Sequence, residues 1–284
     1  MKIELYKKNY QSSALTFGVI GHVEWVDFCL VDQIPKAGEI SHAISTFEEV
    51  AGGGSVSAIK MSKLSNNKIK FFTSLGRDAC GEKCLSRLNS YGIDTKVAWR
   101  KSPTRKGISF VDKKGERAIT VIGKRLEANI RDDLPWDELK ECDAIFITAA
   151  DSQLIRLCRE ASVVCATPRL GIRTINESQI CLDAIIGSGL DPGERFEKSE
   201  LQISPKYIIK TEGKSGGEYS PGGRFKAIIS QGTDIDSYGC GDSFAAGVTV
   251  GLGSKLSIED SIYLGAELGS ECSKFLGPYD RSLT

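Results

Sequence analysis

Short apolar segments alternate with helical segments along most of the chain, and this alternation limits the possible fold more than any other feature. Residues 144–149 (AIFITA) are typical of a buried strand, and the helical pattern of residues 153–161 follows at once. Short buried strands separated by helices predict a parallel sheet that is covered on both faces, with ligands beyond the carboxyl ends of its strands. Further strands are expected at 15–21, 69–75, 163–166, 184–186 and 207–210, and further helices at 81–91, 242–251 and 257–276.

Two segments depart from this alternation and predict a small β-sheet inserted into the larger fold. Residues 23–50 show half-exposed strand patterns, and residues 97–122 show a hairpin pattern around the turn 112–115 (DKKG). The expected fold class is therefore α/β, with a central, mostly parallel sheet flanked by helices and a small inserted β-sheet. Residues 1–284 are expected to form one domain, with the strands of the small sheet inserted at about 23–50 and 97–122. Arg105, on the hairpin of the small sheet, is expected to be solvated.

Charge and cysteine content argue against several classes of protein. Lys and Arg number 37, as do Asp and Glu, so the chain lacks the positive excess on which general binding to nucleic acids or anionic membranes depends. No apolar run approaches the roughly 18–20 residues of a membrane span, and residues 1–12 lack the apolar stretch of a signal peptide. The nine cysteines are scattered without a Cys-x-x-Cys pair, which argues against a zinc site or a disulfide framework and favours a reducing cytoplasm.

The stretch from Asp236 to Asp242 (DSYGCGD) carries the clearest chemistry. Gly239 and Gly241 flank Cys240, so successive backbone N–H groups can converge on an anion at the start of the helix that follows. Asp242 could accept a proton from a substrate hydroxyl that attacks a phosphoryl group, or it could only cap that helix. The position of Cys240 at a helix N-terminus is expected to lower the pKa of its thiol.

A second glycine motif, GKS at 213–215, matches the end of a P-loop, G-x-x-x-x-G-K-[ST]. The first glycine of that motif would be residue 208, which is Ile208 inside an apparent strand. The chain therefore has no P-loop at this position, and the segment requires another explanation.

The DSYGCGD stretch resembles the DTxGAGD motif of the ribokinase-like (PfkB) carbohydrate kinases, with Ser237 for Thr and Cys240 for Ala. Both substitutions are small, and they keep the two glycines and both aspartates. Gly277 stands where the family has a C-terminal glycine, so the resemblance extends from about Phe17 to Gly277. Further motifs follow in the family's order: VIG at 19–21, IPKAGE at 34–39, AGGG at 51–54, LGRD at 75–78 with a glycine at 81, and TEGKSG at 211–216.

This resemblance implies an ATP-dependent kinase with a large α/β domain and a β lid. It implies that Asp242 is the catalytic base and that the N–H groups of Gly239, Cys240 and Gly241 stabilise the transferred phosphoryl group. It also implies several binding residues: Gly53 and Gly54 for the substrate, Thr211, Gly213 and Gly216 for ATP, and Asp236 near a site for a monovalent cation such as K⁺.

Three substitutions in the implied substrate site set this chain apart from ribokinases. In a gap-free alignment, Glu24 stands where ribokinases carry a sugar-binding Asn, and Val26 where they carry a sugar-binding Asp. Ser57 stands where the family usually has Asn, and Asp27 would face the other side of a strand. Ribose is therefore disfavoured, because a site without a partner for a buried hydroxyl discriminates strongly against that substrate. Glu24 could bind a hydroxyl or an amine, or it could be a solvated lid residue.

The family's N-x-x-E motif, which orders magnesium through water, is altered in this chain. After the strand at 184–186, either Asp191 or Glu194 offers a carboxylate, and the sequence does not choose between them. Mg²⁺ accepts carboxylates through water readily, so either residue is compatible with a magnesium requirement.

The sequence thus predicts an ATP-dependent, magnesium-requiring kinase that phosphorylates a hydroxyl of a sugar or sugar-like small molecule. The alternative is a nucleotide-binding member of the same fold that has lost catalysis and has a regulatory role. Asp242 favours the enzyme, because a non-catalytic relative has little need of a base there. A cytoplasmic location, a homodimer through the lid, and no nucleic-acid or membrane partner complete the expectations.

Overall fold

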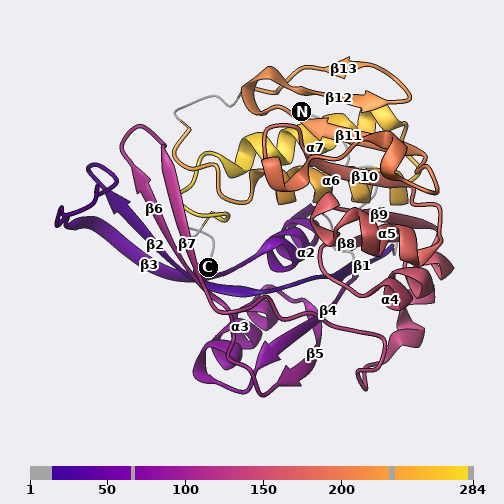
Figure 1. Cartoon of the computed structure of the whole chain (residues 1–284), viewed down its shortest axis with the longest axis horizontal. Helices are drawn as coiled ribbons and strands as arrows, with labels where there is room; N and C mark the ends of the chain where they lie inside the picture. Colours follow the sequence, from indigo (N-terminus) through magenta and orange to yellow (C-terminus); the bar gives the residue numbers. More distant parts are fainter. Residues whose placement is uncertain (1–14, 65–67, 230–233, 281–284) are drawn as a thin grey trace.

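The computed structural model describes residues 15–64, 68–229 and 234–280, which form two β-sheets with helices packed on the larger one (Figure 1). This arrangement confirms the predicted α/β class with a small separate sheet. The large sheet has the spatial order β13 (Arg224–Phe225), β12 (Gly217–Ser220), β11 (Tyr207–Thr211), β10 (Ala184–Ser188), β9 (Val163–Ala166), β8 (Ala144–Ile147), β1 (Thr16–Ile20), β4 (Lys68–Gly76) and β5 (Asp94–Arg100).

All pairs of neighbouring strands from β11 across the sheet to β5 are parallel, and β12, near one edge, pairs antiparallel with both β11 and β13. In the centre, Val19 pairs with Phe71 on one side and with Phe146 on the other. These side chains are buried because helices cover both faces, so the strands are continuous apolar runs.

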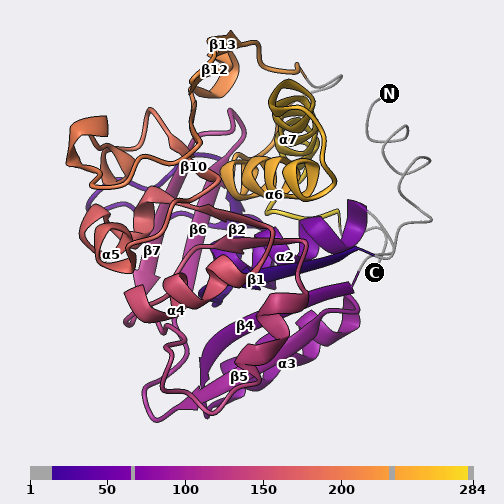
Figure 2. The same cartoon turned by 90° about the vertical axis from the view of Figure 1, so that its right-hand side faces the viewer.

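The helices divide between the two faces of the large sheet. Helices α2, α6 and α7 lie on one face, and α4 and α5 lie on the other (Figure 2). Val19 belongs to the first core and Ile20 to the second, as the alternation of side chains along a strand requires. The helices are α2 (Gly53–Leu64), α3 (Ala79–Ser90), α4 (Ser152–Leu157), α5 (Ile172–Ser178), α6 (Cys240–Gly253) and α7 (Ile258–Cys272), with 3-10 turns η1 (Trp136–Glu141), η2 (Cys158–Glu160), η3 (Pro168–Leu170), η4 (Pro192–Glu194), η5 (Lys198–Glu200) and η6 (Gly213–Ser215).

The small sheet is the lid, and it projects from the end of the large sheet in Figure 1. Its order is β3 (Ala43–Ala51), β2 (Glu24–Val31), β6 (Lys106–Asp112) and β7 (Arg117–Ile122). Strands β6 and β7 form the expected hairpin, in which the N–H of Gly115 donates to the carbonyl of Asp112 at 3.0 Å. Strand β2 pairs with β6, so the two lid segments meet as the sequence predicted.

The second lid segment is shorter than the predicted 97–122. Residues 97–100 belong to β5, which pairs in parallel with β4 at the edge of the large sheet, and lid pairing begins at Lys106. The physical reason is the connection, since helix α3 returns the chain beside β4 and β5 is the second strand of a β–α–β unit. An edge strand of the large sheet is partly exposed, as a lid strand is, so the two have similar sequence patterns.

Helices α6 and α7 cross with their backbones in close contact at two glycines of α6. A Cβ on Gly247 would lie 2.6 Å from the Cα of Gly265, and a Cβ on Gly251 would lie 2.8 Å from the Cα of Ser261. At its other end, α6 meets β8, where a Cβ on Gly253 would lie 2.7 Å from the Cβ of Ala144. Glycine is required at each contact, and α6 is fixed between the sheet and α7.

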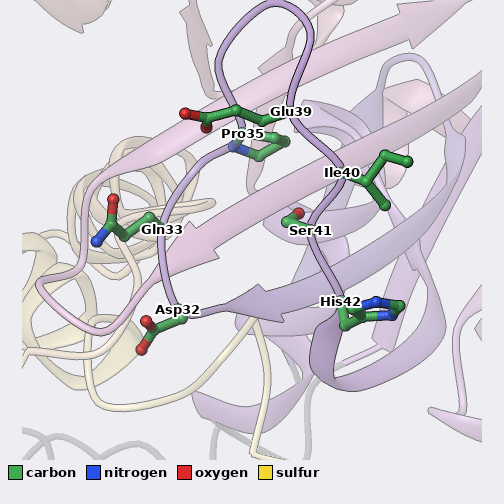
Figure 3. A pocket seen from close by; sticks show the side chains of 7 residues that line it. All are labelled: Asp32, Gln33, Pro35, Glu39, Ile40, Ser41 and His42. Carbon is green, nitrogen blue, oxygen red and sulfur yellow. The ribbon is translucent and has the colours of Figure 1, made fainter.

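A shallow hollow lies on the lid in the segment that connects β2 with β3 (Figure 3). Its lining residues belong to an exposed loop, and Ile40 in its wall is 91% exposed. No residue of α2 or α6 lines it, so it does not coincide with the region around Asp242. The lining residues are Asp32, Gln33, Pro35, Glu39, Ile40, Ser41 and His42.

Candidate active site

The turn before α6 places the DSYGCGD stretch at the carboxyl edge of the large sheet. Gly239 has φ +75°, a left-handed conformation that favours glycine, and a Cβ there would lie 3.1 Å from Val56. Helix α6 begins at Cys240, so its first N–H groups point out of the helix end without intrahelical acceptors. The N–H of Cys240 makes only a long turn contact of 3.3 Å with the Ser237 carbonyl. This geometry is suited to an anion.

Asp242 lies in the first turn of α6, partly buried beneath the start of α2. A Cβ on Gly53 would lie only 2.9 Å from Oδ1 of Asp242, so the two helix N-termini meet at this carboxyl group. Burial raises the pKa of Asp242 to about 7, and the charges of Glu194 and Glu24 add to this effect. Arg169 and Arg117 oppose it. A carboxyl group with a pKa near neutrality can take up and release a proton at physiological pH.

The glycines at the start of α2 let the end of β1 come close to Asp242. The N–H of Gly54 donates to the His22 carbonyl at 3.2 Å, and a Cβ on Gly54 would lie 2.8 Å from the backbone of Gly21. Gly53 lies between Asp242 and His22, whose Cε1 would be 3.5 Å from an added Cβ. The structure therefore brings the predicted residues Gly53 and Gly54 to the predicted base.

Ser57 lies in α2 next to the backbone of Asp242 and is not exposed to solvent. Its side chain is fully buried in α2, and its hydroxyl lies 3.4 Å from the backbone carbonyl of Asp242. Ser57, which the sequence predicted to contact the substrate, thus donates instead to the backbone of the first turn of α6.

Glu24 is buried at the root of the lid, which shows that its interpretation as a solvated residue is wrong. Its Oε1 lies 3.2 Å from Nε of Arg105 and 3.5 Å from Nε2 of His22. Burial would raise the pKa of Glu24, but hydrogen bonding and charge from His22, with the charges of Arg105 and Arg125, hold it below its ordinary value. Arg105 was predicted to be solvated, yet its side chain is only 20% exposed because it pairs with Glu24.

On strand β2 the alternation predicted around Glu24 is present. Val26 is fully buried on the same face as Glu24, and a Cβ on Gly107 would lie 3.1 Å from it and 3.7 Å from Oε2 of Glu24. Asp27 points to the opposite, outer face. We call the face that carries Glu24 and Val26 the inner face of the lid.

Arg169 forms an ion-pair cluster that sequence inspection did not reveal. It follows β9 on η3, and its guanidinium pairs with Asp191 and, through Nε at 2.6 Å, with Oε1 of Glu194. Burial would lower the pKa of Arg169, but the charges of Glu194, Asp191 and Asp242 raise it. The only signal in the sequence was its position directly after a predicted strand of the parallel sheet.

The two carboxylates proposed for magnesium are thus side by side, and their oxygens are already engaged. The other oxygen of Glu194 accepts from the N–H of Ser188 at 2.6 Å, and Oδ1 of Asp191 accepts from the N–H of Gly193 at 2.8 Å. In the part of the chain that the structure describes, no group of three or more His, Cys, Asp or Glu residues could hold a metal ion directly. All four carboxylate oxygens thus accept from Arg169 or from backbone N–H groups, and a Mg²⁺ ion held here through water stays a prediction.

The residues predicted for ATP lie next to this cluster, at the ends of β10 and β11. Thr211 ends β11, and its carbonyl accepts from the N–H of Gly189 at 2.8 Å. Gly213 and Gly216 have φ of +57° and +87° and shape the turn into β12. A Cβ on Gly216 would lie 2.1 Å from the Phe225 carbonyl, so this turn requires glycine.

Asp236 connects the glycine turn to the C-terminal segment. Its side chain is buried. Oδ1 accepts a hydrogen bond from the N–H of Tyr238 and Oδ2 accepts one from the N–H of Gly277, both at 2.9 Å. Nη1 of Arg117 is 3.9 Å from Oδ1, and its guanidinium lies 5.6 Å from the ring centre of Tyr238. Both carboxylate oxygens therefore accept backbone hydrogen bonds, and a monovalent cation beside Asp236 stays a prediction.

The predicted lowering of the Cys240 thiol pKa is wrong. A hydrogen bond with Cys272 and burial raise the pKa of Cys240, while its partner has a pKa lowered to about 7. The Cys240 hydrogen bond is the main cause at Cys272, and the positive charge of Lys60 contributes.

One family of known proteins matches the sequence of this chain. The sequence matches the pfkB family carbohydrate kinases over residues 18–167. Among curated proteins, none matches the sequence significantly. No helix in the described residues is long and apolar enough to cross a membrane.

Solved structures of ribokinases and a nucleoside kinase share the fold. The Thermotoga maritima ribokinase is 19% identical, with a TM-score of 0.73 over 93% of this chain and 94% of that one. The Arabidopsis thaliana ribokinase, solved with ribose and ATP, is 19% identical, with a TM-score of 0.71 over 93% and 94%. The Sinorhizobium meliloti adenosine kinase is 15% identical, with a TM-score of 0.72 over 95% and 97%. With a family match over just over half of its residues, the chain belongs to the pfkB family of carbohydrate kinases.

Proposed function

We propose that the protein is an ATP-dependent kinase that transfers a phosphoryl group to a hydroxyl of a sugar or sugar-like small molecule. The observation that carries this proposal is Asp242, a partly buried carboxyl group with a pKa of about 7 at the N-terminus of α6. It lies within electrostatic reach of Arg169 on one side and Glu24 on the other. This placement is appropriate for a base between a nucleotide site and an acceptor site.

In this proposal the chain contributes positioning and charge more than covalent chemistry. Asp242 accepts the proton of the attacking hydroxyl, and the backbone N–H groups of Gly239, Cys240 and Gly241 stabilise the negative charge of the transferred group. Arg169 offsets part of the negative charge of Asp191 and Glu194 at the strand ends, where anions in parallel sheets bind.

The nucleotide and its metal are assigned to the neighbouring strand ends. Thr211, Gly213 and Gly216 shape the ATP site, as the family motif implies. Asp191 and Glu194 would hold Mg²⁺ through water, and the ion would neutralise charge on the phosphates. We also assign a site for a monovalent cation such as K⁺ to the region near Asp236.

The deciding experiment is a coupled ADP-release screen over pentoses, hexoses, sugar acids, sugar phosphates, inositols and nucleosides. We expect ADP release that depends on one class of acceptor and on Mg²⁺. Asp242→Asn should lower kcat by roughly 10²-fold or more while leaving ATP affinity unchanged, because only the proton acceptor is lost. ATP binding without turnover on any acceptor would instead support a nucleotide-binding protein with a regulatory role.

We also propose a homodimer through the lid, in a cytoplasmic protein without nucleic-acid or membrane partners. Ile44 and Ile122 are 52% and 49% exposed on β3 and β7, the two edge strands of the lid, and a second copy that pairs along an edge would cover one of them. All nine cysteines are free thiols, which is consistent with a reducing compartment. Light scattering after size exclusion should give a dimer mass for the wild type and a monomer mass for Ile122→Glu.

A further inference from the structure

The identity of the acceptor is the open question, and this inference rests on the proposed kinase activity. Groups that would bind the hydroxyls of a neutral sugar are missing from two expected positions. Val26 is fully buried and apolar, and Ser57 is buried with its hydroxyl at the Asp242 carbonyl. Neither residue offers a polar group to a substrate.

Glu24 does not supply an unpaired negative charge in their place. Its carboxylate lies against Arg105 and His22, and the charge of Arg125 also acts on it. An amine on the substrate would therefore compete with the arginines already present. The interpretation of Glu24 as an amine-binding residue loses its support.

Polar atoms without partners gather on this side of the lid. Within the described residues, Nδ1 of His22, Nε of Arg105 and the hydroxyl of Ser109 are buried without a hydrogen-bond partner. Nε of Arg105 is close to Glu24 but is not aligned with it as a hydrogen bond. Ser109 is two residues beyond Gly107 on β6 and therefore shares the inner face. Nε of Arg105 and the hydroxyl of Ser109 are donors, and buried donors without partners cost free energy, so a ligand that brings acceptor oxygens is favoured here.

A second arginine occupies the other end of the inner face. Arg117 begins β7 opposite Val111, and its charge acts on Asp242. Its nearest acidic neighbour, Asp236, is 3.9 Å away and already accepts two backbone hydrogen bonds. Arg105 and Arg117 thus lie on the acceptor side of the base, whereas Arg169 pairs with Asp191 and Glu194 at the strand ends.

We propose that the acceptor is an anionic sugar-like molecule whose carboxylate or phosphate group is bound by Arg105, with Arg117 as a second contact, while one of its hydroxyls lies at Asp242. The planar guanidinium group matches the paired oxygens of a carboxylate or a phosphate, and such charge-assisted bonds are stronger than neutral ones. Glu24 is then a positioning residue, which holds Arg105 at the root of the lid.

The test compares three acceptors built on one carbon skeleton: a neutral sugar, its sugar acid and its monophosphate. We expect kcat/KM for the acid or the phosphate to exceed that for the neutral sugar by about 100-fold, since charge-assisted contacts are each worth a tenfold factor or more. The difference between the acid and the phosphate tells which anionic group the site takes. Equal or greater kcat/KM for the neutral sugar would overturn the proposal.

Variants at the arginines make the assignment specific. Arg105→Gln should remove about 30-fold or more of the preference for the anion, defined as the ratio of kcat/KM for the anionic acceptor to that for the neutral sugar, mainly through KM for the anion. Arg117→Gln should act in the same direction. Arg173→Gln is the matched control, because Arg173 is 92% exposed on α5, on the face of the sheet that α6 does not cover. An unchanged preference in both Arg105→Gln and Arg117→Gln contradicts the proposal.

Binding without ATP separates this inference from the proposed activity. In thermal-shift titrations the sugar acid or the phosphate should stabilise the wild type, and Arg105→Gln should lose that stabilisation. If no acceptor is phosphorylated but this pattern appears, the kinase activity fails and the anion site remains. If neither anion stabilises the wild type, the anion site is wrong whatever the kinetics show.

Discussion

At the scale of single residues, Asp242 determines how the protein should respond to pH. The proposed base must be ionised to accept a proton, and its pKa of about 7 places that ionisation near neutrality. We therefore expect kcat/KM to fall about tenfold per pH unit below pH 7 and to level off above it. Asp242→Asn should show a flat profile over this range, measured by ADP release at constant ionic strength. A wild-type profile that is flat down to pH 5.5 would contradict the assignment.

The same carboxyl group should cost stability at the pH where it works. Its pKa is raised on folding from an ordinary 3.8, so its stabilising contribution is complete below about pH 4 and is lost as pH rises through about 7. Asp242→Asn, which carries no charge, should be more stable than the wild type at pH 8 by about 1–3 kcal/mol. The difference should vanish near pH 4. Urea denaturation at both pH values measures it, and a variant less stable at pH 8 refutes the raised pKa.

At the scale of secondary-structure elements, the site depends on the close meeting of two helix N-termini. A Cβ on Gly53 would approach Oδ1 of Asp242 to 2.9 Å, so Gly53→Ala must displace the base or the start of α2. We expect kcat to fall by roughly 10- to 100-fold with little change in ATP affinity. Gly223→Ala is the control, because a Cβ there would meet no atom within 4 Å. Equal activities of the two variants would remove this contact from the mechanism.

The sequence predicted elements well where the local pattern determines them. The apolar runs at β1, β8 and β9 are continuous because both faces are buried, and the turn at 112–115 is a local signal. Strand β5 was assigned to the lid, because an edge strand with one covered face has the same alternation as a lid strand. Only the return path of the chain through α3 distinguishes the two cases.

Site residues that depend on distant partners were not predictable in the same way. Arg169 meets Asp191 and Glu194, which are 22 and 25 residues away, and no local pattern connects them. The pKa of Cys240 depends on Cys272, which reaches it only through the packing of α7. By contrast, Asp242 and Gly53 lie in sequence motifs that are complete within a few residues, and the structure brings them together.

At the scale of the whole molecule, the crossing of α6 and α7 fixes the helix that carries the proposed base. Because Gly247 meets Gly265 without side chains between them, α6 cannot slide or tilt without backbone collisions. Any closure over a bound acceptor must therefore come from the lid, and the base stays where the core holds it. Substrate binding should then slow backbone hydrogen exchange in β6 and β7, while exchange in α6 stays unchanged. Faster exchange in α6 on binding would show that the base itself moves.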